Sequence, residues 1–166
     1  MLEILRSKIK PTFFVDAMLG NIAKKLRLFG YDAEYSSNTT DKDLILKVKE
    51  ENRILITKDQ QLSGIAQKQK ISVILITMNE ELEQLIQIFK NLKLSKLTVN
   101  GNTARCTECN EELQIIEKKL VLNQVPKGII EKINNFWTCP NCNKIYWEGT
   151  HIDRLQKFVV ELNEKL

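Results

Sequence analysis

The chain has 166 residues, four cysteines and a formal net charge of +4. That length accommodates one domain, or one domain with a small appendage. Apolar residues make up 43% of the chain and charged residues 28%, which is typical of globular proteins and excludes a mainly disordered or fibrous chain. The longest aliphatic run covers only residues 73–76, which is too short to cross a membrane, and no apolar stretch of signal-peptide length precedes Pro11. We therefore expect a soluble, cytoplasmic protein with no membrane partner.

The basic excess lies in residues 1–100, whereas residues 101–166 carry equal numbers of acidic and basic side chains. Four cysteine thiolates with one Zn²⁺ would lower the net charge to about +2. An excess this small is compatible with a polyanionic partner but does not by itself indicate one.

Short apolar runs alternate with amphipathic segments over residues 1–100. Gly30 is expected to end the first helix, and Gly20 to allow a close backbone approach. Strands that alternate with helices predict an α/β fold with a mostly parallel sheet covered on both faces. The predicted strands cover residues 12–15, 33–35, 53–57 and 72–77, and the predicted helices cover residues 17–29, 41–51, 60–68 and 79–92.

A turn signal at residues 100–102 divides the chain into an α/β domain over residues 1–100 and a smaller unit over residues 101–166. In the smaller unit we predict a short helix at 126–135 and a final amphipathic helix at 152–165 that packs the unit onto the sheet domain. Its large aromatic side chains are expected to form a core or docking surface rather than to stack on bases. They are Phe136, Trp137, Tyr146 and Trp147.

The four cysteines form two C-x-x-C pairs. Two such turns supply the four soft ligands that a structural zinc ion takes in a tetrahedron. The alternatives are two disulfides or a redox C-x-x-C motif. An asparagine follows each pair and suits the left-handed backbone of a tight turn. We therefore predict a zinc site at Cys106, Cys109, Cys139 and Cys142.

Two predicted strands are followed by aspartates, Asp16 and Asp59, and Asp41 opens the helix between them. The carboxyl ends of parallel strands meet at one edge of a sheet, where ligands bind at the switch in strand order. Clustered carboxylates favour Mg²⁺ or Mn²⁺, which can activate water against a phosphodiester. The alternative for all three is a polar or capping role, with Asp41 as a helix N-cap. No glycine-rich nucleotide-binding motif follows any strand.

Several motifs in order resemble the PIN-like RNase family named for the Mut-seven C-terminal domain. They are residues 14–20 (FVDAMLG), residues 53–59 (RILITKD), the two C-x-x-C pairs and residues 146–151 (YWEGTH). The resemblance spans about residues 12–155. It implies a PIN-like α/β/α domain followed by a zinc ribbon, and metal-dependent cleavage of RNA.

The resemblance also implies roles for individual residues. Asp16 and Asp59 match the family's metal-binding acids, and Asp41 matches its helix-start acid, with Asp43 as a helper. PIN domains often carry a fourth acid after the next strand, where this chain has Asn79, a neutral and weaker ligand.

Three further residues complete the expected site. Lys24 and Lys58 are candidate phosphate contacts, against a plain surface role. His151 is the only histidine, and it has either a structural role at a helix start or a role near phosphate or substrate.

Three functions remain open on the sequence alone. The first is a ribonuclease that hydrolyses RNA through an aspartate cluster holding Mg²⁺ or Mn²⁺. The second is a non-catalytic RNA- or ribosome-associated binding module. The third is a toxin-like nuclease restrained by a partner protein, for which the sequence carries no interaction motif.

Overall fold

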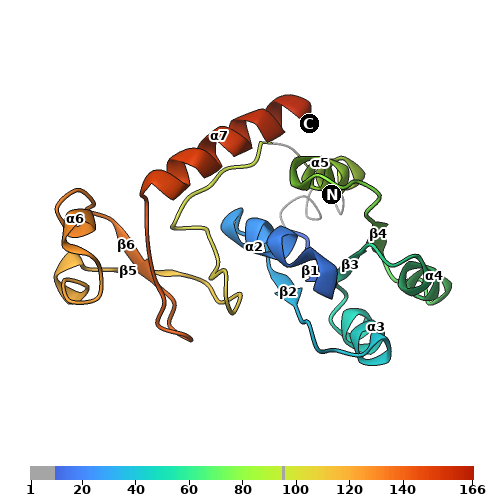
Figure 1. Ribbon diagram of the computed structural model, residues 1–166. Helices are drawn as coiled ribbons and strands as arrows, with labels where there is room; N and C mark the ends of the chain where they lie inside the picture. Colours follow the sequence, from blue (N-terminus) through green and yellow to red (C-terminus); the bar gives the residue numbers. More distant parts are fainter. Residues whose placement is uncertain (1–9, 95) are drawn as a thin grey trace, which may run out of the picture.

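The computed structural model describes residues 10–94 and 96–166 (Figure 1). A parallel sheet with strand order β2-β1-β3-β4 forms the first part of the molecule. Its strands are β1 (Phe13–Val15), β2 (Ala33–Tyr35), β3 (Ile54–Thr57) and β4 (Val73–Leu75). The helical elements that connect or follow them are η1 (Ala17–Leu19), α2 (Gly20–Leu28), α3 (Asp41–Glu50), α4 (Gln60–Lys68) and α5 (Glu81–Asn91). The predicted α/β fold with a parallel sheet is confirmed.

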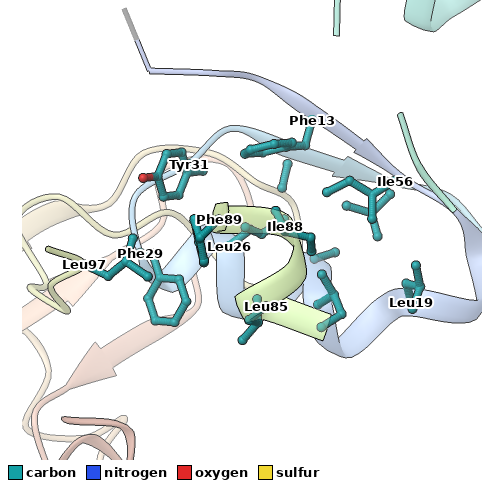
Figure 2. Close-up of a cluster of buried hydrophobic side chains, with 14 of the residues drawn as sticks. Phe13, Leu19, Leu26, Phe29, Tyr31, Ile56, Leu85, Ile88, Phe89 and Leu97 are labelled. Carbon is teal, nitrogen blue, oxygen red and sulfur yellow. The ribbon is translucent and has the colours of Figure 1, made fainter. Parts of the chain in front are cut away.

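Helices cover both faces of the sheet, and successive side chains of its strands point to opposite faces and into two cores. Phe13 and Val15 join the core that α2 and α5 cover, and Figure 2 shows Phe13, Leu85 and Phe89 in it. Phe14 and its neighbours pack instead beneath α3 and α4. Figure 1 shows α3 and α4 on the opposite side of the sheet from α5, which gives the three layers of an α/β/α fold.

Local signals fix the helix ends. Gly30 has φ +81° directly after the first helix ends, a conformation that glycine adopts without strain. The N-cap of α3 is Thr40, whose hydroxyl accepts a hydrogen bond from the Asp43 backbone N–H. The alternative in which Asp41 is the N-cap is therefore wrong, because threonine one position earlier already occupies that role.

The second part of the molecule contains a three-stranded antiparallel sheet of order β5-β6-β7. Its small core is built on Phe136 and Val121. The predicted helix over 126–135 is too long, because α6 ends at Ile130, and Asn134 and Asn135 favour a turn before the next strand. The elements of this part are β5 (Gln114–Ile116), η2 (Lys118–Leu120), α6 (Lys127–Ile130), β6 (Phe136–Thr138) and β7 (Ile145–Trp147).

The last helix, α7 (Thr150–Lys165), runs back to the first part of the molecule (Figure 1). Leu155, Val159 and Leu162 enter the same core as α2 and α5. The Asn163 side chain donates to the Leu97 carbonyl and accepts from the Leu97 N–H, both at 2.9 Å. The final helix thus completes the core of the sheet region, and the domain division at residue 100 remains a prediction. No helix in the described part of the chain is long and apolar enough to cross a membrane.

Candidate functional site

Asp16 follows the central strand β1 at the carboxyl edge of the parallel sheet. Its Oδ1 accepts a hydrogen bond from the Ala17 N–H at 2.6 Å and caps the short helix η1. Its Oδ2 accepts a hydrogen bond from the Thr57 hydroxyl at 2.7 Å. Asp16 is half-buried, so its carboxylate is held in place by two donors and still reaches solvent.

Asp59 lies beside it at the end of the neighbouring strand. Thr57, the last residue of β3, is fully buried, and its hydroxyl oxygen also accepts the Asp59 N–H at 2.9 Å. Asp59 caps α4, with Oδ1 accepting from the N–H groups of Gln61 and Leu62. No described residue donates a hydrogen bond to its Oδ2. One buried hydroxyl therefore links the Asp16 carboxylate to the backbone of Asp59.

The strand order makes this position a switch point. From β1 the chain passes to β2 on one side, then crosses to β3 on the other side. The ends of β1 and β3 diverge into η1 and α4, which is the arrangement that opens a ligand crevice in α/β sheets. Asp16 and Asp59 occupy those two ends.

Asp41 and Asp43 lie in the exposed first turn of α3. Asp43 Oδ2 accepts a hydrogen bond from the Thr40 hydroxyl at 2.8 Å, so it takes part in capping the helix. Among the side chains that the structure describes, Asp16, Asp41 and Asp59 do not converge into a group of three metal ligands.

The two lysines predicted to contact phosphate lie in different surroundings. Lys58 lines a cavity at the carboxyl edge together with Asn79. Lys24 faces the cysteine region instead: the pKa of Glu108 is lowered first by its hydrogen bond to Lys144 and, less strongly, by the charge of Lys24. His151 belongs to α7, but its side chain lies outside the described part of the molecule.

Asn79 lies after β4, at the position where PIN domains often carry a fourth acid. Asn79 is exposed, and its carbonyl accepts a hydrogen bond from the Gln84 amide at 2.9 Å. Glu80 precedes α5 as its N-cap residue, and Glu81 lies in the first turn of that helix. Glu81 forms an ion pair with Lys25 at 2.7 Å and lines the same cavity as Lys58. Sequence reasoning gave Glu81 no role.

The four cysteines meet as predicted. Their sulfurs lie within 4.8 Å of one another. Cys106 Sγ is 3.5 Å from Cys142 Sγ, and Cys109 Sγ is 3.3 Å from Cys139 Sγ. All four cysteines are free thiols in the structure, and none is paired in a disulfide. A zinc ion bonded to sulfur at about 2.3 Å requires sulfurs about 3.8 Å apart in a tetrahedron, so the four cysteines could hold a structural metal such as zinc.

The pKa values of two of the thiols shift in opposite directions. Burial alone would raise the pKa of Cys106, but hydrogen bonds from Tyr146 and from two backbone N–H groups of its own turn lower that pKa to about 6. Burial raises the pKa of Cys139 to about 12. Four adjacent thiolates repel one another, so a divalent cation is the group that stabilises the full set.

Tyr146, for which the sequence predicted a core or docking role, also contacts this group of cysteines. Its hydroxyl lies 3.1 Å from Cys106 Sγ and accepts a hydrogen bond from the Thr107 N–H at 3.1 Å. The other aromatic side chains have the predicted structural role. Phe136 is fully buried, and Trp137 is buried and donates through Nε1 to Asn102 at 2.9 Å.

The first cysteine turn is bonded directly to the parallel sheet. Arg27, only 5% exposed, donates from Nε to the Ala33 carbonyl at 2.8 Å and from Nη1 to the Thr107 carbonyl at 2.7 Å. Asn110 accepts from the Ala33 N–H at 3.0 Å and donates to Asp32 Oδ1 at 2.7 Å. These contacts join the cysteine region to β2 through a buried cation.

Burial and neighbouring charges act on both ionised groups of that junction. Burial lowers the pKa of Arg27, although the nearby cysteine thiolates act to raise it. Burial also acts to raise the pKa of Asp32, but hydrogen bonds from Arg53 and Asn110 outweigh it and lower the pKa. The lowered pKa keeps Asp32 ionised at neutral pH, and an arginine guanidinium stays protonated in proteins.

A comparison with known protein families identifies this arrangement. Residues 11–159 match the family described as the Mut7-C RNAse domain. The chain belongs to that family. The match covers both the parallel sheet with its aspartates and the four cysteines, so the resemblance seen in the sequence is confirmed. Membership in the Mut7-C RNAse domain family indicates a ribonuclease-type function with RNA as substrate. No curated protein in the comparison matches the chain.

Proposed function

We propose that the protein is a PIN-type ribonuclease that hydrolyses RNA phosphodiester bonds with Mg²⁺ or Mn²⁺ held by aspartates at the carboxyl edge of the parallel sheet. The observation that carries this proposal is the pairing of Asp16 and Asp59 at the switch point through the buried Thr57 hydroxyl. Two free cysteine pairs also fit a reducing, cytoplasmic setting.

The donor set at this edge fits a hard divalent cation. Asp16 and Asp59 supply carboxylate oxygens at a place open to solvent, and such oxygens are the ligands that Mg²⁺ and Mn²⁺ take. In this proposal, Asp16 and Asp59 hold the ion, and Asp41 completes the site or orients the attacking water, with Asp43 as its helper. The bound ion would neutralise phosphate charge and lower the pKa of water.

The chain's other residues position the acids and the substrate. Thr57 holds the Asp16 carboxylate in one orientation, since its hydroxyl donates to Oδ2 at 2.7 Å. Lys58 follows it directly and lines the edge cavity, where an ammonium group would contact an RNA phosphate. We give Lys24 a lesser place in substrate binding, because it faces Glu108. His151 remains a candidate for contact with phosphate or substrate.

The test is cleavage of end-labelled single-stranded RNA, with single-stranded DNA beside it, in Mn²⁺ or Mg²⁺. We expect Asp16→Asn to reduce cleavage by more than about 100-fold. That loss exceeds the usual loss of activity when only a residue that orients a metal ligand is changed. The fold should persist because the amide oxygen still accepts the Ala17 N–H. Asp153→Asn, an exposed acid in the first turn of α7, is the matched control and should cleave normally. Equal cleavage by the Asp16 variant would contradict the assignment.

A second function has its own support. Asn79 replaces the usual fourth acid, and the three aspartates do not converge among the described side chains. Both features suit a non-catalytic RNA- or ribosome-associated module. RNA binding without cleavage, equal in the wild type and in Asp16→Asn, would favour that module over the enzyme.

A further inference from the structure

Two hollows flank Lys58 at the carboxyl edge of the parallel sheet. One has a volume of about 430 Å³ and is lined by Met18 and Asn21. The other has a volume of about 270 Å³ and is lined by Met78. Lys58 and Asn79 line both hollows, so the lysine stands between them.

Each hollow has a methionine at its rim. Met18 is 75% exposed and Met78 is 42% exposed. The protein has only three methionines, and the third is the first residue of the chain. Single exposed apolar side chains are ordinary. Two methionines on either side of one lysine, beside the candidate acids, form a pattern that the fold itself does not require.

The backbone fixes the outward position of Met18. Asp16 caps the short helix that carries it, and the Tyr35 hydroxyl donates to the Ala17 carbonyl at 3.0 Å. Leu19 fills the core directly below and is 3% exposed. Because both contacts hold the turn at Ala17 and the next side chain, Leu19, points inward, Met18 points to solvent.

The polar groups of the hollows match a nucleotide without selecting one base. Lys58 forms no ion pair with any residue that the structure describes. Its ammonium group is thus available to a phosphate. The side-chain amides of Asn21 and Asn79 each offer both a donor and an acceptor. A methionine thioether is polarizable and makes favourable contacts with aromatic rings.

We propose that Met18 and Met78 are base-contacting platforms that hold unpaired nucleobases of single-stranded RNA on either side of Lys58, with little preference among bases. Lys58 contacts the phosphate between them. This inference rests on the proposed function of the same edge as an RNA site. It assigns the substrate as an unpaired strand, because stacking on a side chain requires an exposed base face.

The test measures binding in the Asp16→Asn protein, so that cleavage does not disturb it. Fluorescent ten-nucleotide oligo(U), oligo(A), oligo(C) and an RNA duplex are titrated without added Mg²⁺ or Mn²⁺. We expect Met18→Ala with Met78→Ala to weaken binding of all three single strands by about tenfold, which equals about 1.4 kcal/mol. Met18→Leu should retain binding. Val160→Ala, which truncates an apolar side chain on α7 that is 58% exposed, should change nothing.

Three results would overturn the inference. The first is an unchanged affinity for single strands in the double variant. The second is an equal loss of affinity for the RNA duplex. The third is a more than tenfold difference in affinity among the three single strands when both methionines are present. The outcome separates this inference from the enzyme proposal. If RNA binding depends on the two methionines but the wild-type protein never cleaves RNA, only the enzyme proposal fails. If the wild-type protein cleaves RNA and the Met18, Met78 double variant has the same KM, only the platform proposal fails.

Discussion

The two sets of metal-binding residue types in this protein are assembled in different ways. The four cysteines converge within 4.8 Å, on two turns that each carry two of them. The aspartates come from the ends of separate elements and do not converge as a group among the described side chains. Two turns bring the sulfurs together, as a structural metal site needs. The carboxylates lie apart at an open sheet edge, which suits the exchange of metal and substrate that the proposed function requires.

Loss of the cysteine-bound metal should have the largest effect on stability. Structural zinc contributes on the order of 10 kcal/mol in small zinc units, and this region has only a small core of its own. We expect Cys139→Ser, or removal of zinc by a chelator, to lower Tm by more than about 10 °C. Thermal unfolding followed by circular dichroism, together with zinc analysis, measures this. Withdrawal of Mg²⁺ or Mn²⁺ alone serves as the control and should leave Tm unchanged.

A variant that loses zinc without any change in Tm would contradict the structural role of the cysteines. The cysteines would then no longer differ from the aspartates as a site that stabilises the fold.

Arg27→Met should have the next largest effect, because it breaks the junction between the two regions. Arg27 is buried and makes charged hydrogen bonds to carbonyls of β2 and of the first cysteine turn. We expect a loss of about 2 kcal/mol in the free energy of unfolding and faster hydrogen exchange at the Ala33 amide. Lys49→Met, at an exposed position of α3, is the control. Unchanged exchange at Ala33 would show that the junction does not hold β2.

Thr57→Val should affect activity far more than stability. Valine keeps the shape of threonine but removes the hydroxyl that bonds Asp16 and Asp59. Loss of a group that orients a metal ligand typically costs about 10–100-fold in metal affinity or activity. We expect that loss in Mn²⁺-dependent cleavage, with recovery in Thr57→Ser, which keeps the hydroxyl. Failure of the serine variant to recover activity would point to packing rather than to positioning.

Much of the fold could be predicted from local patterns. The alternation of buried strands and amphipathic helices predicts the parallel sheet, and each of the four strands of that sheet lies within about two residues of its predicted range. The conformation of the turns at the cysteine pairs was also predicted. Asn110 and Asn143 follow the cysteine pairs and have φ 68° and 60°, the left-handed conformation that was expected after each turn.

Contacts between distant parts of the chain could not be predicted in this way. Thr57 bonds Asp16 across 41 residues, and Arg27 bonds Thr107 across 80. Arg27 lies near the edge of the apolar face of its helix, so its burial depends on a partner region that no helical period reveals. Thr57 lies in the motif at residues 53–59, but only the folded arrangement shows that its hydroxyl reaches the Asp16 carboxylate and the Asp59 backbone N–H.

Mn²⁺ binding to zinc-loaded protein tests the central claim most directly. Free Mn²⁺ is followed by electron paramagnetic resonance during titration of the wild type and of Asp16→Asn, with zinc content measured in both. The account predicts Mn²⁺ binding by the wild type, a loss of that binding in Asp16→Asn, and one zinc per chain in each protein. Equal Mn²⁺ binding by the two proteins would contradict it.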